Sequence, residues 1–275
     1  MPTTAASCRT CFIVPPGCFV AGYSCFASSE GIFHDQFPCC PRIFVSHTWF
    51  DIPMSADLSK HWIHEGFIAF DTETTGVEVD SARVVTAAAV VFEGSVPLYT
   101  RSWLIKVDVD IPEVTTAVHG ITNEMSQAEG QEQSAALVEI RDFLAGSGMP
   151  IVCFNSGFDI PLFNANLARL GLDLLPTDQV LCSFVIDKQC NKYVKGKAQR
   201  RLKPTADRYG IELTEEDWHG AEADARVAGQ IFLAELAAYP ELSEFSVTDL
   251  SATVNLWRDQ QDREFQEWLS RQPQR

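Results

Sequence analysis

Asp71 and Glu73 stand two residues apart, directly after the apolar run at 67–70, and the turn-forming sequence Thr-Thr-Gly follows them. An apolar run closed in this way predicts a buried strand that ends in a turn. Alternate residues of a strand face the same side, so both carboxylates project together. Adjacent carboxylates repel unless a cation lies between them, and Mg²⁺ prefers oxygen ligands of this kind. Taken alone, the pair is more typical of a turn with solvated acids.

Two further acidic residues follow in the order that a metal and phosphate site would need. Asp159 comes after a strand-like run at 151–154, and apolar residues recur beyond it with helical spacing. We expect Asp159 near the start of that helix. Asp224 lies in the first turns of an Ala-rich helix that runs to about Ala238. His219 precedes Gly220, which predicts that it lies on the loop before this helix.

These three motifs, Asp-x-Glu-Thr-Thr-Gly, Asn-x-x-Phe-Asp and His-x-x-x-x-Asp, resemble those of the DEDDh 3′→5′ exonucleases. The resemblance is greatest to the proofreading (epsilon) subunits of bacterial DNA polymerase III and their stand-alone phage and actinobacterial relatives. It extends over residues 66–238, roughly two thirds of the chain, and the segments 111–113, 118–122 and 202–211 also fit. Each motif is weak by itself, whereas three in this order are specific.

The resemblance implies an α/β, ribonuclease-H-like fold and hydrolysis of DNA from the 3′ end to 5′-mononucleotides, in replication proofreading or repair. Two metal ions, Mg²⁺ or Mn²⁺, would activate a water molecule and stabilise the leaving 3′-oxygen. His219 titrates near neutral pH and would accept the proton of the attacking water; otherwise it is a solvated loop histidine. The metal ligands implied are Asp71, Glu73, Asp159 and Asp224.

Substrate contacts follow from the same resemblance. The backbone N–H groups after Glu73 would meet the 3′-terminal nucleotide, and His119 would lie against it unless it is a surface turn residue. Asn155 suits the N-cap of a helix, which is compatible with substrate contact. Phe158 and Trp218 would stack on bases or, more typically, belong to the core. The substrate-binding residues expected are Thr74, Thr75, Gly76, His119, Asn155 and Phe158.

One departure from the family pattern concerns the segment 178–184. The family usually has an Asp there, but the aligned position in this chain is Cys182, with Asp178 and Asp187 nearby. That Asp is not one of the four metal ligands in the family. The departure therefore concerns local packing more than activity.

The remaining pattern predicts the elements that must position these residues. Strands are expected at 67–71, 84–92 and 98–106, joined as antiparallel hairpins by short turn-forming separators. A helix near 131–145, a strand at 150–154 with its helix at 158–170, and helices near 198–209 and 221–238 follow. Three meandering strands followed by α/β units predict a mixed sheet with helices on its faces.

Charge is distributed unevenly along the chain. The net charge is −16, although phosphate binding normally rests on Lys and Arg. Seven basic residues gather between the second and third acidic motifs, where they would guide a single strand or form a solvated loop. They are Lys188, Lys192, Lys195, Lys197, Arg200, Arg201 and Lys203. This predicts a small footprint on a strand end rather than a long grip on a duplex.

Residues 1–60 form a leader of different composition, which holds six of the nine cysteines. Cys8 and Cys11, with His34, have the spacing of a zinc knuckle, but the other spacings fit no zinc module. A secreted disulfide framework conflicts with the intracellular chemistry downstream. No signal peptide or membrane span is indicated. We expect a poorly ordered leader, or an upstream start assigned in error, with the natural start near Met54.

Residues 61–240 are the expected exonuclease domain, and 241–275 an amphipathic helical tail that packs back on the domain or docks to a polymerase or clamp. We expect a cytoplasmic protein that acts on single-stranded DNA 3′ ends. One alternative is an RNA-trimming exoribonuclease of the same family, since only the 2′-hydroxyl separates the two substrates. Another is a non-catalytic nucleic-acid or polymerase-binding subunit, against which the intact set of five catalytic residues argues.

Overall fold

The structure, a computed structural model, describes residues 62–213 and 220–272. The predictions for the leader, for Trp218 and for His219 fall outside the described residues. No helix in the two described segments is long and apolar enough to cross a membrane.

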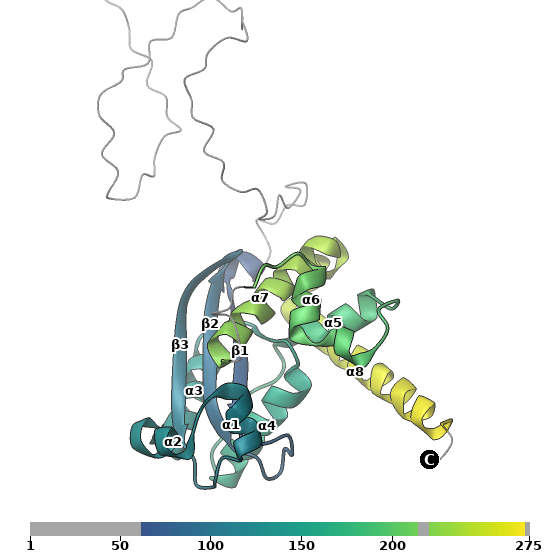
Figure 1. Cartoon of the computed structure of the whole chain (residues 1–275). Helices are drawn as coiled ribbons and strands as arrows, with labels where there is room; N and C mark the ends of the chain where they lie inside the picture. The colour runs from purple at the N-terminus through teal and green to yellow at the C-terminus, as the bar shows by residue number, and fades with distance from the viewer. Residues whose placement is uncertain (1–61, 214–219, 273–275) are drawn as a thin grey trace, which may run out of the picture. The chain divides into compact units, whose positions relative to one another are not determined.

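A mixed sheet, six-stranded over the described residues, is the central layer (Figure 1). Strands β1 (Phe67–Thr74), β2 (Val84–Glu93) and β3 (Val96–Lys106) form an antiparallel meander. Strands β5 (Ile151–Cys153) and β6 (Val180–Cys182) continue the sheet from β1 in parallel, and the two-residue strand β4 (Gln131–Glu132) pairs with β3 in parallel. The strand order is β4-β3-β2-β1-β5-β6, which confirms the expected mixed α/β sheet.

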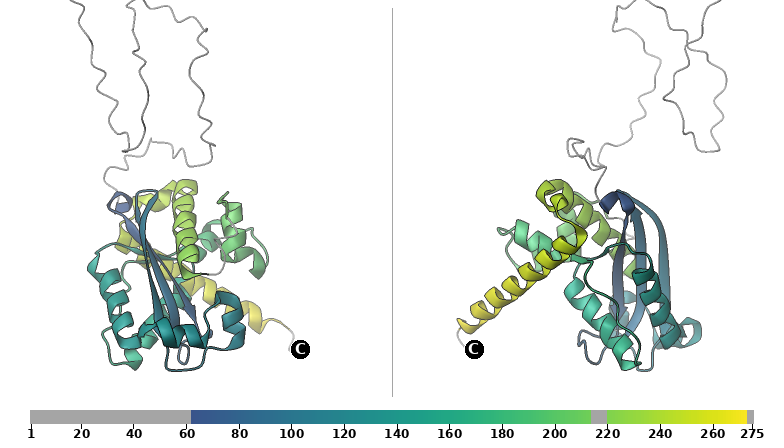
Figure 2. Two further views of the ribbon diagram at one scale, coloured as in Figure 1. Left: turned by 60° about the vertical axis from the view of Figure 1, so that its left-hand side comes forward. Right: turned by 180° about the vertical axis from the view of Figure 1, so that it is seen from behind.

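Helices cover both faces of this sheet. In the described segments they are α1 (Glu113–His119), α2 (Asn123–Glu129), α3 (Gln133–Gly146), α4 (Ser156–Arg169), α5 (Ser183–Cys190), α6 (Leu202–Arg208), α7 (Ala221–Ala238) and α8 (Val247–Ser270), with short 3₁₀-helices η2 (Trp62–Glu65), η3 (Lys197–Arg200) and η5 (Pro240–Glu244). Figure 2 shows α3 and α7 on opposite sides of the sheet.

Strand β1 separates two apolar cores, because its successive side chains point to opposite faces. Ile68 and Phe70 pack with α3 and α4, whereas Phe67 and Ala69 pack with α5, α7 and α8. All four side chains are fully buried. Because both faces of β1 are buried, residues 67–70 are all apolar. The end of β1 therefore lies between helices from both layers.

The predicted elements are largely present, but several differ from the prediction. Strand β1 runs on to Thr74 rather than ending at residue 71, so Glu73 as well as Asp71 lies within the strand. The helix predicted at 198–209 is divided into η3 and α6 at Arg201, because Pro204 cannot continue a helix through residue 200. The short elements α1, α2, β4, β6 and α5 were not predicted, since such short strands and helices carry too little periodicity to be recognised.

Candidate active site

The carboxylates of Asp71 and Glu73 extend the face of β1 that begins with Phe67 and Ala69. That face packs against α7, whose first turn carries Asp224. The alternation of β1 therefore directs two acids toward the helix that supplies the third. The third acid is fixed in place locally, because its backbone N–H donates to the carbonyl of Gly220 at 3.0 Å.

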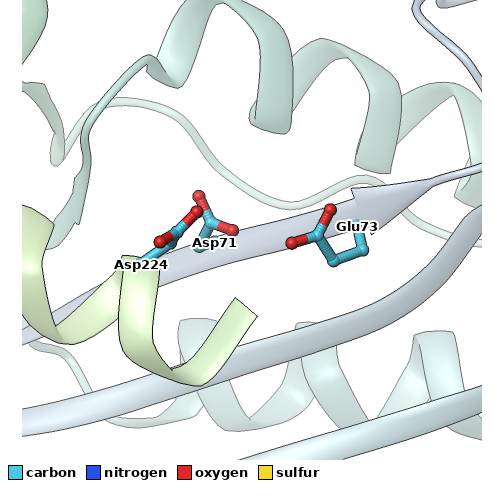
Figure 3. A group of neighbouring side chains, drawn as sticks. All are labelled: Asp71, Glu73 and Asp224. Carbon is cyan, nitrogen blue, oxygen red and sulfur yellow. The ribbon is translucent and has the colours of Figure 1, made fainter. Parts of the chain in front are cut away.

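These three acids form one cluster. One oxygen from each of Asp71, Glu73 and Asp224 lies within 4.8 Å of the others. Figure 3 shows Asp71 and Glu73 spaced along the strand, with Asp224 approaching Asp71 from the helix. Several carboxylate oxygens at this spacing are the donor set that Mg²⁺ or Mn²⁺ takes, so the residues present fit a divalent metal site.

At the site, several partly buried negative charges are held close together. Burial, and then the charges of Asp159, Asp224 and Glu73, raise the pKa of Asp71 well above its usual value. Burial, and then Asp224 and Asp159, raise the pKa of Glu73 to about 7. A bound cation would reverse this repulsion and favour the charged forms.

Asp159 approaches the cluster from the other layer. It lies in the first turn of α4, is 4% exposed, and accepts a hydrogen bond from Thr72 Oγ1 to its Oδ1 at 2.8 Å. Burial raises the pKa of Asp159 to about 7, and the Thr72 hydrogen bond opposes the shift. The structure thus brings the fourth predicted ligand near the other three, but holds it through a threonine.

Thr72 was missed by sequence reasoning. It lies between Asp71 and Glu73, and the period of the strand places it on the opposite face, toward α4. Its partner Asp159 is 87 positions away in sequence. Period two could have indicated the face, but no local signal could have indicated the partner.

The predicted amide donors after Glu73 are partly engaged already. The Thr75 N–H donates to the carbonyl of Arg83 at 2.9 Å, so the expectation that this amide is free for a nucleotide is wrong. Thr74 Oγ1 donates to the Gly76 carbonyl at 2.7 Å, which holds the turn after β1 closed. Substrate contact by Thr74 and Gly76 stays a prediction.

His119 is a buried residue at the end of α1, so its alternative as a surface turn histidine is wrong. Its Nδ1 accepts a hydrogen bond from the Ile121 N–H at 3.1 Å, and its buried Nε2 has no partner among the described residues. Burial lowers the pKa of His119, and the backbone of Thr74 opposes this. Burial thus favours the neutral imidazole, and the backbone of Thr74 places His119 near the end of β1; its contact with the terminal nucleotide stays a prediction.

Asn155 lies at the N-cap of α4, as expected, but its exposed side chain makes no capping hydrogen bond, so capping by the side chain is wrong. Phe158 is half-buried against the core formed with α3 and α4. Contact of either residue with substrate is not decided by this geometry and stays a prediction.

The segment that departs from the family pattern is packed tightly. Cys182 ends β6 and is buried, with its Sγ 3.5 Å from the Phe154 carbonyl oxygen. Asp187, 1% exposed, pairs with Arg200 at 2.9 Å and with Arg208 at 2.8 Å. Arg200 is thus part of a buried ion pair. The prediction that its charge guides a single strand of DNA is therefore wrong.

Comparisons with known proteins agree with this geometry. The model of a family described as "Exonuclease" (RNase_T) matches residues 68–232. The chain is 31% identical over 179 residues to the DNA polymerase III subunit epsilon of Treponema pallidum, which covers 63% of this chain and 78% of that protein.

Solved structures share the fold at lower identity. Exonuclease I of E. coli in complex with a dT13 oligonucleotide matches with a TM-score of 0.54 at 19% identity, over 64% of this chain and 42% of that chain. Exonuclease X in complex with 5′ overhanging duplex DNA matches with a TM-score of 0.52 at 18% identity, over 67% of this chain and 99% of that one. The chain therefore spans less than half of Exonuclease I, and the likeness shows the ribonuclease-H-like fold.

Proposed function

The chain belongs to the exonuclease family, and we propose that it is a metal-dependent 3′→5′ exonuclease that hydrolyses DNA to 5′-mononucleotides in replication proofreading or repair. The observation that carries this proposal is the carboxylate cluster of Asp71, Glu73 and Asp224, with oxygens within 4.8 Å of one another. Gathered carboxylates repel one another and raise one another's pKa, and a bound cation would offset that repulsion.

Two divalent ions, when bound, supply an activated water molecule and neutralise the leaving 3′-oxygen. The residues that would hold them are Asp71, Glu73, Asp159 and Asp224. The protein contributes the fixed geometry of these oxygens, since β1, α4 and α7 are each anchored in a core. Thr72 Oγ1 holds the Asp159 carboxylate through a hydrogen bond to its Oδ1.

The remaining roles belong to residues around the cluster. We propose that His219 takes the proton of the attacking water, on the strength of its position five residues before Asp224. The buried imidazole of His119, with an Nε2 that lacks a partner among the described residues, would donate or accept a hydrogen bond at the terminal nucleotide. Exposed Asn155 would contact the substrate from the start of α4.

A cytoplasmic location and a polymerase or clamp partner are proposed by analogy with the relative named DNA polymerase III subunit epsilon. The described segments include no membrane-crossing helix. Co-purification of the tagged chain with the polymerase and clamp of its own cell is the measurement for the partner. Recovery of the chain alone would contradict it.

The experiment for the function uses single-stranded oligonucleotides labelled at the 5′ end, as DNA and as RNA, with Mg²⁺ or Mn²⁺. Hydrolysis from the 3′ end produces a ladder of shortening labelled products, whereas attack from the 5′ end releases the label at once as a mononucleotide. DNA cleavage with the ladder is the expected result. A ladder from RNA alone would identify the RNA-trimming alternative, and no product with either substrate would identify a non-catalytic subunit.

The matched variants are Asp224→Ala, which removes a clustered carboxylate, and Asp142→Ala, which removes a carboxylate that is 61% exposed on α3. The first should abolish the ladder and the second should leave it unchanged. Full activity in Asp224→Ala would contradict the metal site.

A further inference from the structure

Helix α8 lies beyond the residues that match the exonuclease family, yet one of its side chains reaches the helix that carries Asp159. Arg258 Nη2 donates to Ser156 Oγ at 2.7 Å, in the first turn of α4. Its Nε is 3.4 Å from the point where a Cβ of Gly157 would lie, and Asn155 Oδ1 is 3.7 Å from the same point. The guanidinium therefore rests on the start of α4, beside an exposed asparagine.

The charge of Arg258 is not offset by any ion pair among the described residues. The N-terminal end of a helix is its positive end, so a cation there is placed unfavourably with respect to the helix dipole. A hydroxyl partner satisfies one N–H of the five that an arginine offers. The remaining N–H groups of Arg258 are therefore suited to bind an anion.

A cleft of ≈ 360 Å³ opens further along the same helix, between α5 and α8. Its lining carries two cations that form no ion pair within the described segments, Lys188 and Lys192. The carboxylate of Glu264 accepts a hydrogen bond from Gln260 at 2.9 Å, and Arg200 is engaged with Asp187. The polar and basic side chains that line the cleft are Lys188, Gln189, Lys192, Arg200, Gln260 and Gln261.

Arg258 and the cleft are connected through α5. The Phe184 N–H donates to the carbonyl of Phe154, just before Asn155, at 2.8 Å. Gln261, one turn beyond Arg258, donates from Nε2 to the Val185 carbonyl at 3.1 Å and lines the cleft. One helical turn is about 5.4 Å along the axis, so the lining of the cleft begins at Gln261, about one turn along α8 from Arg258.

We propose that α8 and α5 form a second binding surface, for the internal phosphates of the single strand that leads to the 3′-terminal nucleotide. Arg258 is the inner phosphate contact, next to α4, and Lys188 with Lys192 are the outer contacts in the cleft. This inference rests on the proposed function, because it takes the ligand to be a single-stranded polynucleotide. It adds the C-terminal helix, which the matched domain does not include, to the substrate-binding surface.

The experiment measures binding by fluorescence anisotropy of 5′-labelled DNA, with Ca²⁺ in place of Mg²⁺, for a dinucleotide and for an oligomer of about ten nucleotides. Arg258→Gln should weaken binding of the longer strand by roughly ten- to a hundredfold, the range for one lost charge-assisted hydrogen bond. The slope of log K against log salt should fall by about 0.7 for one lost phosphate contact. The dinucleotide should be affected less. Arg271→Gln, at a guanidinium that is 75% exposed at the far end of α8, is the control and should change neither value.

If Arg258→Gln weakens the affinity for the dinucleotide and for the longer strand equally, or also lowers the melting temperature, Arg258 only attaches α8 to the domain. Either result would overturn the proposal. If Arg258→Gln does not fold, the double variant Lys188→Gln/Lys192→Gln decides, since neither lysine has an ion pair within the described segments. Unchanged affinity and salt slope in that variant would overturn the proposal. Hydrolysis by the unaltered chain in Mg²⁺ is measured separately, so failure of the proposed function is recognised independently.

Discussion

At the scale of single residues, Asp71 experiences burial and three neighbouring carboxylates, all of which raise its pKa. A carboxyl group whose pKa is higher in the folded than in the unfolded protein binds more protons when folded. The metal-free protein therefore loses stability as the pH rises from the unfolded pKa, near 4, toward the raised folded values, about 7 for Glu73 and Asp159.

Asp71→Asn should abolish hydrolysis and at the same time stabilise the metal-free protein, because it removes one of the repelling charges. We expect a higher melting temperature in EDTA by about 2–4 °C for each kcal/mol gained, with a difference that is larger at pH 8 than at pH 5. Thermal unfolding in EDTA at both pH values is the measurement. A variant that is destabilised at pH 8 would show that Asp71 has a structural role which outweighs repulsion.

His219 is the predicted proton acceptor. His219→Ala should lower the rate roughly 10²–10⁴-fold while metal binding is largely kept, and the wild-type rate should fall at low pH as the imidazole protonates. Rates from pH 5 to 9 and metal titration by calorimetry are the measurements. If His219→Ala hydrolyses DNA at the wild-type rate and with the same pH profile, His219 is not the proton acceptor.

At the scale of elements, α7 must lie close to the sheet to bring Asp224 to the strand. Gly229 makes this approach possible: a Cβ there would meet Phe92 Cε2 at 2.5 Å and Ala69 Cβ at 3.1 Å. Both neighbours belong to buried strands, so neither can move away without a change in the core.

Gly229→Ala should therefore destabilise the protein by about 1–3 kcal/mol and lower the rate, because α7 shifts and Asp224 with it. Gly146→Ala is the control, since nothing lies within 4 Å of its added Cβ at the end of α3, and it should be neutral or stabilising by up to about 1 kcal/mol. Urea unfolding and the rate of both variants are the measurements. If the two substitutions had equal effects, close packing at Gly229 would not be the cause.

The basic stretch after α5 divides into two kinds of residue. Lys195, Lys197 and Arg201 are exposed, whereas Arg200, 11% exposed, pairs with a buried aspartate. The triple change Lys195→Gln/Lys197→Gln/Arg201→Gln should raise KM for oligonucleotides and lower the salt slope by up to about 2 (about 0.7 for each contact), without loss of stability. KM at several salt concentrations is the measurement.

Arg200→Gln is the contrasting variant. It leaves Asp187 buried with one arginine fewer, which should cost part of the about 3–5 kcal/mol typical of a broken buried pair, because Arg208 remains. If Arg200→Gln keeps full stability, or if the triple change leaves KM and its salt dependence unaltered, this division is wrong.

At the scale of the whole molecule, a chain of net charge −16 binds a polyanion only where its charge is locally reversed. Metal ions at the carboxylate cluster and a few exposed cations would provide that reversal. This limits the footprint to a strand end and makes binding sensitive to salt.

A protein that begins at Met54 should be folded and fully active if the leader contributes nothing to the domain. The first described contacts begin later, at Trp62, which stacks on Phe232 at 6.0 Å and donates from Nε1 to the Phe245 carbonyl at 3.2 Å. Activity, melting temperature and zinc content of the full and shortened chains are the measurements. One zinc ion per chain that is lost with residues 1–53 would instead make the cysteines a structural site.

The sequence by itself determined the fold class and the positions of the acidic residues along the elements. The strand period placed Asp71 and Glu73 on one face, and the pattern of apolar residues placed Asp159 and Asp224 at helix starts, because these are local properties. Their assignment as the metal ligands came from the resemblance of the motifs and stays a prediction. The mixed sheet and the bounds of α7 followed from the same patterns.

Only the tertiary structure decided what depends on contacts between distant segments. Thr72 is recognised as the partner of Asp159, Arg200 as the partner of Asp187, and Arg258 as a neighbour of Ser156 only when the chain is folded. These pairs are 87, 13 and 102 positions apart, and no periodicity connects residues across such distances. Side-chain partnership is set by which faces of sheet and helices pack together, and that packing is a property of the whole core.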